Sequence, residues 1–237
     1  MTRHFQREVD LIKKKILSLS AIVEESVHRA VRAISERDLK LANKVIENDE
    51  EIDQMEVEVE EECLKTLALN QPVAIDLRFI IAVLKINNDL ERIGDLAVNI
   101  AERAAFLATK ERINIPFDFR GMSDKAKEML HKSLDALVNM DSHLAREVML
   151  ADDEVDEMHR KMYAQVQEGI LKEPNKLDCL INLLAVSRQL ERIADHATNI
   201  AEDVVYMIDG EIVRHGKIDF YASKNGKSPQ SGTRFSG

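Results

Sequence analysis

The chain has 237 residues, of which 32% are charged and 4% aromatic, with only four Pro and eight Gly. Gly and Pro interrupt helices, so this composition favours long helices. The formal net charge of −10 repels phosphate backbones and excludes nucleic acid as an expected partner. No apolar run is long enough for a transmembrane segment. The two cysteines, Cys63 and Cys179, fit buried thiols in a reducing, cytoplasmic compartment.

Helical hydrophobic periodicity predicts an all-α protein with six helices in chain order. The predicted helices cover about residues 5–34, 39–69, 74–110, 123–139, 142–172 and 175–209. Ser35 or Asp38 is available as the N-cap of the second helix, and the sequence Asn70-Gln71-Pro72 indicates the turn after it. We therefore expect short connections throughout, with the weakest helical signal in the middle of the chain.

The sequence contains an internal repeat. Residues 90–102 and 190–202 are identical at ten of thirteen positions, and the preceding helices match at an offset of 103. A repeat of this length indicates two copies of one supersecondary unit. We predict two tandem three-helix bundles, residues 1–112 and 123–215, joined by a linker at 113–122 and followed by a disordered polar tail at 216–237.

Acidic residues recur on one face of each repeat. At about 100° per residue, Glu91, Asp95 and Asn99 share one sector of their helix, opposite its apolar side. Asp49 and Asp53 share a sector of the helix before. If the two helices lie antiparallel, the two acidic ridges meet, and a cation relieves the repulsion between them. The predicted metal ligands are Asp49, Asp53, Glu91, Asp95, Asn99, Asp152, Asp156, Glu191, Asp195 and Asn199.

The identity of the metal stays open, because oxygen ligands with an occasional His suit Mg²⁺, Mn²⁺, Fe or Zn²⁺. A solvated acidic face or a partner surface explains the same residues without any ion. One rival is a di-iron carboxylate enzyme that uses the Glu-x-x-His pairs Glu25/His28 and Glu128/His131. Another is a metal-free structural helical protein. No phosphate-binding loop, nucleophile elbow or Cys-His pair is present, so we expect no catalytic residues, no organic cofactor and no enzyme.

The repeated motifs resemble those of the PhoU family of bacterial phosphate-signalling regulators. The resemblance rests on residues 90–95 and 190–202, on 76–82 and on the acidic helix around 49–53, and it spans about residues 5–212. It implies two three-helix bundles with pseudo-twofold symmetry. It also implies metal ions or clusters held by x-x-x-Asp pairs, here Asp49 with Asp53, Glu91 with Asp95, Asp152 with Asp156 and Glu191 with Asp195.

The resemblance further implies a function and partners. Members of the family are expected to be cytoplasmic, non-enzymatic negative regulators of phosphate uptake and of the phosphate-starvation response. They are expected to act as adaptors between the ATPase subunit of a phosphate ABC transporter and a membrane sensor histidine kinase. A homodimer, held at the inner face of the membrane through these partners, is the assembly that the resemblance predicts.

Overall fold

A computed structural model of the chain describes residues 3–113 and 118–213, and all elements within these ranges are helical. No helix in the described ranges has the length and apolar character needed to cross a bilayer. The first half contains α1 (Arg3–Glu36), α2 (Leu39–Glu47), α3 (Asp49–Asn70) and α4 (Ile75–Ala108). The second half contains α5 (Phe119–Asn139), α6 (Ser142–Lys172), a 3-10 turn (Pro174–Lys176) and α7 (Leu177–Asp209).

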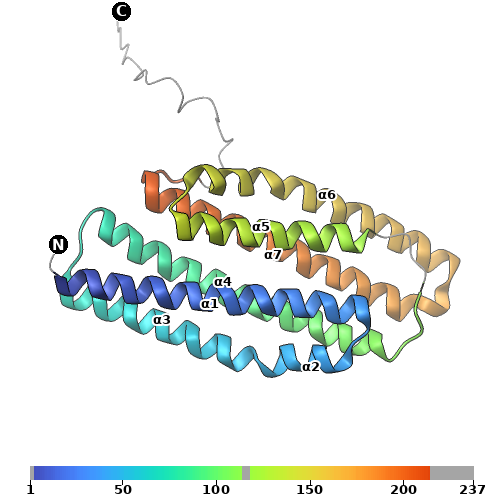
Figure 1. Cartoon of the computed structure of the whole chain (residues 1–237). Coiled ribbons are helices and arrows are strands. Elements are labelled where there is room, and N and C mark those ends of the chain that lie inside the picture. The colour runs from blue at the N-terminus through green and yellow to red at the C-terminus, as the bar shows by residue number, and fades with distance from the viewer. Residues whose placement is uncertain (1–2, 114–117, 214–237) are drawn as a thin grey trace, which may run out of the picture.

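The helices form two bundles that lie side by side. One bundle comprises α1 to α4 and the other α5 to α7, with α3 and α6 at the outer edges (Figure 1). The bundles meet where α4 packs along α7 and where α1 contacts α5. The predicted pair of tandem three-helix bundles is therefore confirmed.

The hydrophobic core is formed by the apolar sides of the helices, and these are the sides that the repeated motif predicts to be buried. In the first copy Leu90, Ile93 and Ile100 are fully buried, and in the second copy Leu190 and Ile193 are as well. Burial of each such side chain stabilises the fold by roughly 1.5–3 kcal/mol. This packing turns the opposite, acidic side of α4 and α7 outward.

A turn of the same conformation follows the first helix of each bundle. Arg37 and Met140 adopt left-handed conformations with φ of 58° and 52°, and each is followed by an aspartate. Asp38 accepts hydrogen bonds from the backbone N–H groups at the start of α2, and Asp141 does so for α6. Asp38 is thus the N-cap, whereas the Ser35 hydroxyl donates back to the Val31 carbonyl.

Two helix boundaries differ from the prediction. The second predicted helix is interrupted at Asn48, which ends α2 and begins α3. Three acidic residues follow in the first turn of α3, where the helix dipole favours negative charge. Helix α5 begins at Phe119 instead of Ser123, because the Asp118 side chain caps it by accepting from the Gly121 N–H. Residues 114–117 of the predicted linker and the whole predicted tail lie outside the described residues.

Candidate functional site

The first acidic face forms where α3 and α4 pack closely together. Gly94 permits this approach, because a Cβ atom at its position would lie 3.1 Å from Ile52 Cγ2 and 3.8 Å from Asp49 Oδ1. One end of the contact is fixed by the buried Asn87, whose Nδ2 donates to the Glu56 carbonyl at 2.9 Å. The carboxylates of α3 are thereby placed beside those of α4.

Carboxylates on α3 and α4 influence one another's pKa at this face. Burial raises the pKa of Asp49, and the neighbouring charges of Asp53 and Asp95 raise it further. Burial likewise raises the pKa of Glu91, followed by the charges of Asp95 and of residues on α3, while Arg92 opposes the rise. Repulsion between carboxylates thus acts from one helix to the other as well as along each of them.

The second acidic face repeats this arrangement between α6 and α7. Burial raises the pKa of Asp152 to about 6, with further contributions from Asp195 and Asp156, and the nearby Thr198 hydroxyl opposes the rise. The pKa of Asp195 is raised by burial and then by the charge of Asp156. Carboxylates on α6 and α7 therefore raise one another's pKa, as those on α3 and α4 do.

The two asparagines of the predicted set make other contacts. Asn99 Nδ2 donates to the Asp95 carbonyl of its own helix at 2.8 Å. Asn199 Nδ2 donates across the repeat interface to Asp89 Oδ1 at 3.3 Å. Their amide nitrogens are therefore engaged outside the carboxylate clusters.

The carboxylate and amide oxygens of the predicted ligand set are of the kind that bind hard cations. Their side chains do not converge on one point. Among the described residues, no group of three His, Cys, Asp or Glu side chains is placed so that it could hold a metal ion. Glu91 Oε2 and Asp152 Oδ1 are nevertheless shielded from solvent without a hydrogen-bond partner. Arg92 Nε lies 3.5 Å from Glu91 Oε2. A cation at each face would contact the shielded oxygen of that face after a change of side-chain rotamers.

Sequence reasoning missed a polar network that joins the two repeats. Lys85 on α4 pairs with Asp203 on α7 at 2.9 Å, and the Asp203 side chain is only 4% exposed. His196 Nδ1 lies 2.8 Å from Asp89 Oδ1, with both side chains largely buried. The one available signal was that residues 85, 89 and 96 differ from 185, 189 and 196 within an otherwise similar repeat.

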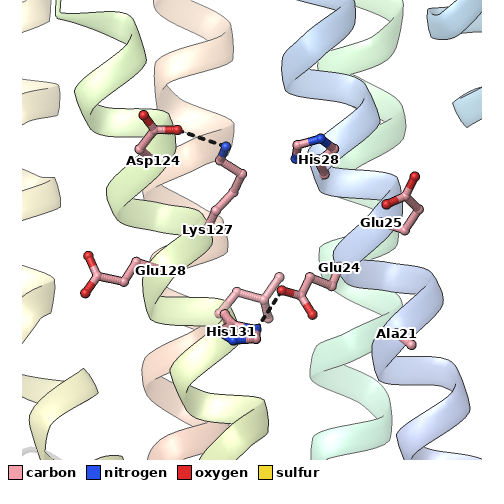
Figure 2. A pocket seen from close by; sticks show the side chains of 9 residues that line it. Ala21, Glu24, Glu25, His28, Asp124, Lys127, Glu128 and His131 are labelled. Carbon is pink, nitrogen blue, oxygen red and sulfur yellow. Dashed lines mark hydrogen bonds and ion pairs between the residues drawn. The ribbon is translucent and has the colours of Figure 1, made fainter.

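The residues of the di-iron alternative gather in a different cleft, between α1 and α5. Figure 2 shows Glu25 and His28 on α1 and Glu128 and His131 on α5 at this cleft, with the Glu25 and Glu128 carboxylates pointing away from each other. The His131 side chain is 58% exposed, and its Nδ1 lies 2.8 Å from Glu24 Oε1. The two glutamates pair with Arg29 and Lys132 on their own helices. These residues therefore form a solvated surface, whereas a di-iron centre requires inward-facing carboxylates.

The fold and the two faces define a class: an all-α protein of two repeated three-helix bundles, each with paired acidic helices. The model of the PhoU domain matches residues 16–104 and again residues 119–204. The chain belongs to the PhoU family.

Relatives match nearly the whole chain. A phosphate-specific transport system accessory protein PhoU homolog from Aquifex aeolicus is 38% identical over 90% of this chain and 96% of its own length. A homolog with the same description from Pseudomonas putida is 37% identical over 91% of this chain and 84% of its own length. The crystal structure of PhoU from Pseudomonas aeruginosa superposes with a TM-score of 0.84 at 36% identity, covering 87% of this chain and 100% of that one. The Streptococcus pneumoniae regulatory protein PhoU gives a TM-score of 0.80 at 30% identity, covering 88% of this chain and 99% of that one.

Proposed function

We propose that this protein is a negative regulator of phosphate uptake and of the phosphate-starvation response, acting through protein contacts and without catalysis of its own. Its relatives are named as accessory proteins of phosphate-specific transport, and they match it over about nine-tenths of its length. The observation that carries the proposal is the double match to the PhoU domain over both bundles.

The proposed partners are the ATPase subunit of a phosphate ABC transporter and a membrane sensor histidine kinase. In this role the protein is cytoplasmic, homodimeric and recruited to the inner face of the membrane by its partners. The long helices support the proposal, because they present extended polar faces to which two different proteins can bind.

Gene deletion tests the regulatory role. Loss of the protein is expected to derepress phosphate-starvation genes in phosphate-rich medium, and the wild-type gene should restore repression. Normal repression in the deletion strain would overturn the proposal.

Capture of tagged protein from membranes at high phosphate, followed by identification of the bound ATPase and kinase, tests the adaptor role. Sedimentation of the purified chain tests the dimer.

We also propose that the acidic faces bind metal ions, one site on α3–α4 and one on α6–α7. The support is the mutual effect of carboxylates on consecutive helices in both repeats, the raised pKa values of Asp49, Glu91, Asp152 and Glu191, and the shielding of Glu91 Oε2 and Asp152 Oδ1 from solvent. A metal bound here would neutralise charge that otherwise weakens the contact between the helices.

Titration calorimetry with Mn²⁺ on metal-free protein tests this second proposal. We expect binding to be lost when Glu91→Gln, Asp95→Asn, Glu191→Gln and Asp195→Asn are combined. The control is the double variant Glu25→Gln with Glu128→Gln, which removes carboxylates from the α1–α5 cleft. Loss of Mn²⁺ binding in the control alone would move the site to that cleft, whereas no binding to the wild-type chain would favour a metal-free structural protein.

A further inference from the structure

An open cleft lies along one side of the contact between α4 and α7 (Figure 1). Lys85 on α4 contacts Asp203 on α7, and Asp89 contacts Asn199, so the two helices run antiparallel here. The cleft has a volume of about 680 Å³. Its apolar part is formed by the partly buried Ile81 and Leu84, and its charged part by Lys85, Asp89, Glu202 and Asp203.

The described lining of this cleft is negatively charged. It holds one cation, Lys85, which pairs with Asp203 at 2.9 Å, against three carboxylates. The Asp89 carboxylate is held in place by His196, whose Nδ1 lies 2.8 Å from Asp89 Oδ1. Negative charge beside apolar surface suits a segment that combines lysine with apolar side chains.

The equivalent place on the other side of the interface has the opposite charge. The offset of 100 residues replaces Asp89 by Gln189 and Lys85 by Ala185. It also puts the cations Arg188 and Arg103 there, with Glu102 as the carboxylate. The negative charge of the cleft is therefore particular to one side, although the helices on both sides are repeats of each other.

The chain leaves α7 next to the acidic side. A Cβ atom at Gly210 would lie 3.5 Å from Arg78 Cζ, and Arg78 precedes Ile81 by about one turn of α4. The last described residue is Val213. Residues 214–237 contain five Lys or Arg and one Asp, so this segment is basic in a chain whose formal net charge is −10.

The C-terminal segment is long enough to reach the whole cleft. Asn199 precedes Gly210 by eleven residues, which corresponds to about 16 Å along α7. A chain covers that distance in about five or six residues when extended. Residues 217–224, with the sequence Lys-Ile-Asp-Phe-Tyr-Ala-Ser-Lys, are therefore within reach of the cleft and combine lysine with apolar side chains.

We propose that the C-terminal segment, residues 214–237, binds in the α4–α7 cleft of its own chain. Its lysines pair with Glu202 and Asp89, and its apolar side chains cover Ile81 and Leu84. Composition predicts disorder for the free segment, and such segments become ordered when they bind. Because the segment continues α7 and the apolar part of the cleft belongs to α4, its binding fastens the two bundles together on this side.

Zero-length carbodiimide cross-linking of the full-length chain tests the contact, because it joins an amine to a carboxylate only where the two touch. We expect mass spectrometry to find links from Lys217 or Lys224 to Glu202, and their loss in Glu202→Gln. The matched control Glu102→Gln, on the other side of the interface, should leave them unchanged. Absence of links to the cleft, or equally frequent links to Glu102, would overturn the proposal.

A mixture of ¹⁵N-labelled and unlabelled chains identifies which chain supplies the segment. Links within chains of one isotope support binding to the same chain. Links that join the two isotopes would assign the cleft to the segment of a second copy and overturn the proposal as stated.

Trypsin provides an independent readout, because it cleaves after Lys217 and Lys224 only when the segment is released. Glu202→Lys is expected to speed this cleavage on the order of fivefold, whereas the control Glu102→Lys should not. Circular dichroism checks that both variants fold. The same cleavage rate in wild type and Glu202→Lys would contradict the binding of the segment in this cleft.

Discussion

The two repeats have the same arrangement of helices but differ in the side chains that pack between their second and third predicted helices. In the first repeat Gly94 faces Ile52, and in the second Ala194 occupies the place of the glycine while Val155 occupies that of the isoleucine. A smaller residue on one helix is thus matched by a larger one on its neighbour. The combined number of side-chain carbon atoms at this pair of positions is therefore the same in both repeats, although neither residue is.

The interface between the repeats is less symmetrical than the repeats themselves. On one side of the pseudo-twofold axis, Lys85 pairs with the buried Asp203 at 2.9 Å and lies 5.1 Å from the centre of the Tyr206 ring. The equivalent place on the other side holds Ala185 and Arg103, and Arg103 donates to Asn182 at 3.3 Å on the exposed surface. The ion pair between the half-exposed Lys85 and the buried Asp203 therefore has no counterpart at the equivalent positions on the other side of the interface.

Lys85→Ala should produce the largest effect, because it gives the first repeat the residue that the second already has. Removal of the cation leaves the largely buried Asp203 carboxylate without Lys85, which we expect to cost about 2–3 kcal/mol in the free energy of unfolding. Urea denaturation followed by circular dichroism measures this cost. Arg103→Ala is the matched control on the other side, with an expected cost below about 0.5 kcal/mol. Equal costs for the two variants would contradict the asymmetry.

Gly94→Ala should have the next largest effect. Its new methyl group would lie 3.1–3.2 Å from two carbon atoms of Ile52, and the resulting strain outweighs the better helix propensity of Ala by about 1 kcal/mol. Adding Ile52→Val copies the second repeat and should recover most of that loss. The unfolding free energies of the two single variants and of the double variant give the coupling free energy between positions 52 and 94.

The second repeat supplies the control for this cycle. Ala194→Gly should cost about 1 kcal/mol through helix propensity and lost packing, because no strain is present there to relieve. Additive effects of Gly94→Ala and Ile52→Val would show that helix spacing does not depend on this pair.

Much of this architecture could be predicted from the sequence, because it depends on local periodicity. The spacing of Leu90, Ile93 and Ile100 fixes the buried side of α4, and the outward position of Glu91 and Asp95 follows from it. The recurrence of these residues one hundred positions later then predicts the second bundle. Short turns favour antiparallel neighbours, which was sufficient to place the acidic ridges side by side.

Features that depend on the docking of distant segments could not be predicted in this way. Lys85 and Asp203 are 118 residues apart, and only the packing of α4 along α7 brings them together. The hydrogen bond between His159 and Ser187 likewise depends on the register of α6 against α7. The break at Asn48 was missed because the apolar periodicity continues across it from Val45 to Ile52.

The smallest predicted effect is a pH dependence located in the second acidic face. The pKa of Asp152 is raised to about 6 in the folded chain, above the ordinary value of 3.8 that applies to the unfolded chain. Its ionised form therefore destabilises the fold at neutral pH. As the pH falls from about 6 to about 4, the folded state binds the proton first, and the free energy of unfolding increases. Because Asp152 is partly exposed, screening by solvent limits this gain to about 1 kcal/mol.

Asp152→Asn should abolish that gain, so that the variant is more stable than wild type at pH 7 and no more stable at pH 4. Denaturation at a series of pH values checks this, with the exposed neighbour change Asp153→Asn as a control that should keep the wild-type dependence. A divalent cation bound at this face stabilises the ionised carboxylates, so saturating metal should also offset the wild-type loss of stability between about pH 4 and pH 6. If Asp152→Asn kept the wild-type pH dependence, the desolvated charge would lie elsewhere, and the second face would resemble an ordinary solvated surface.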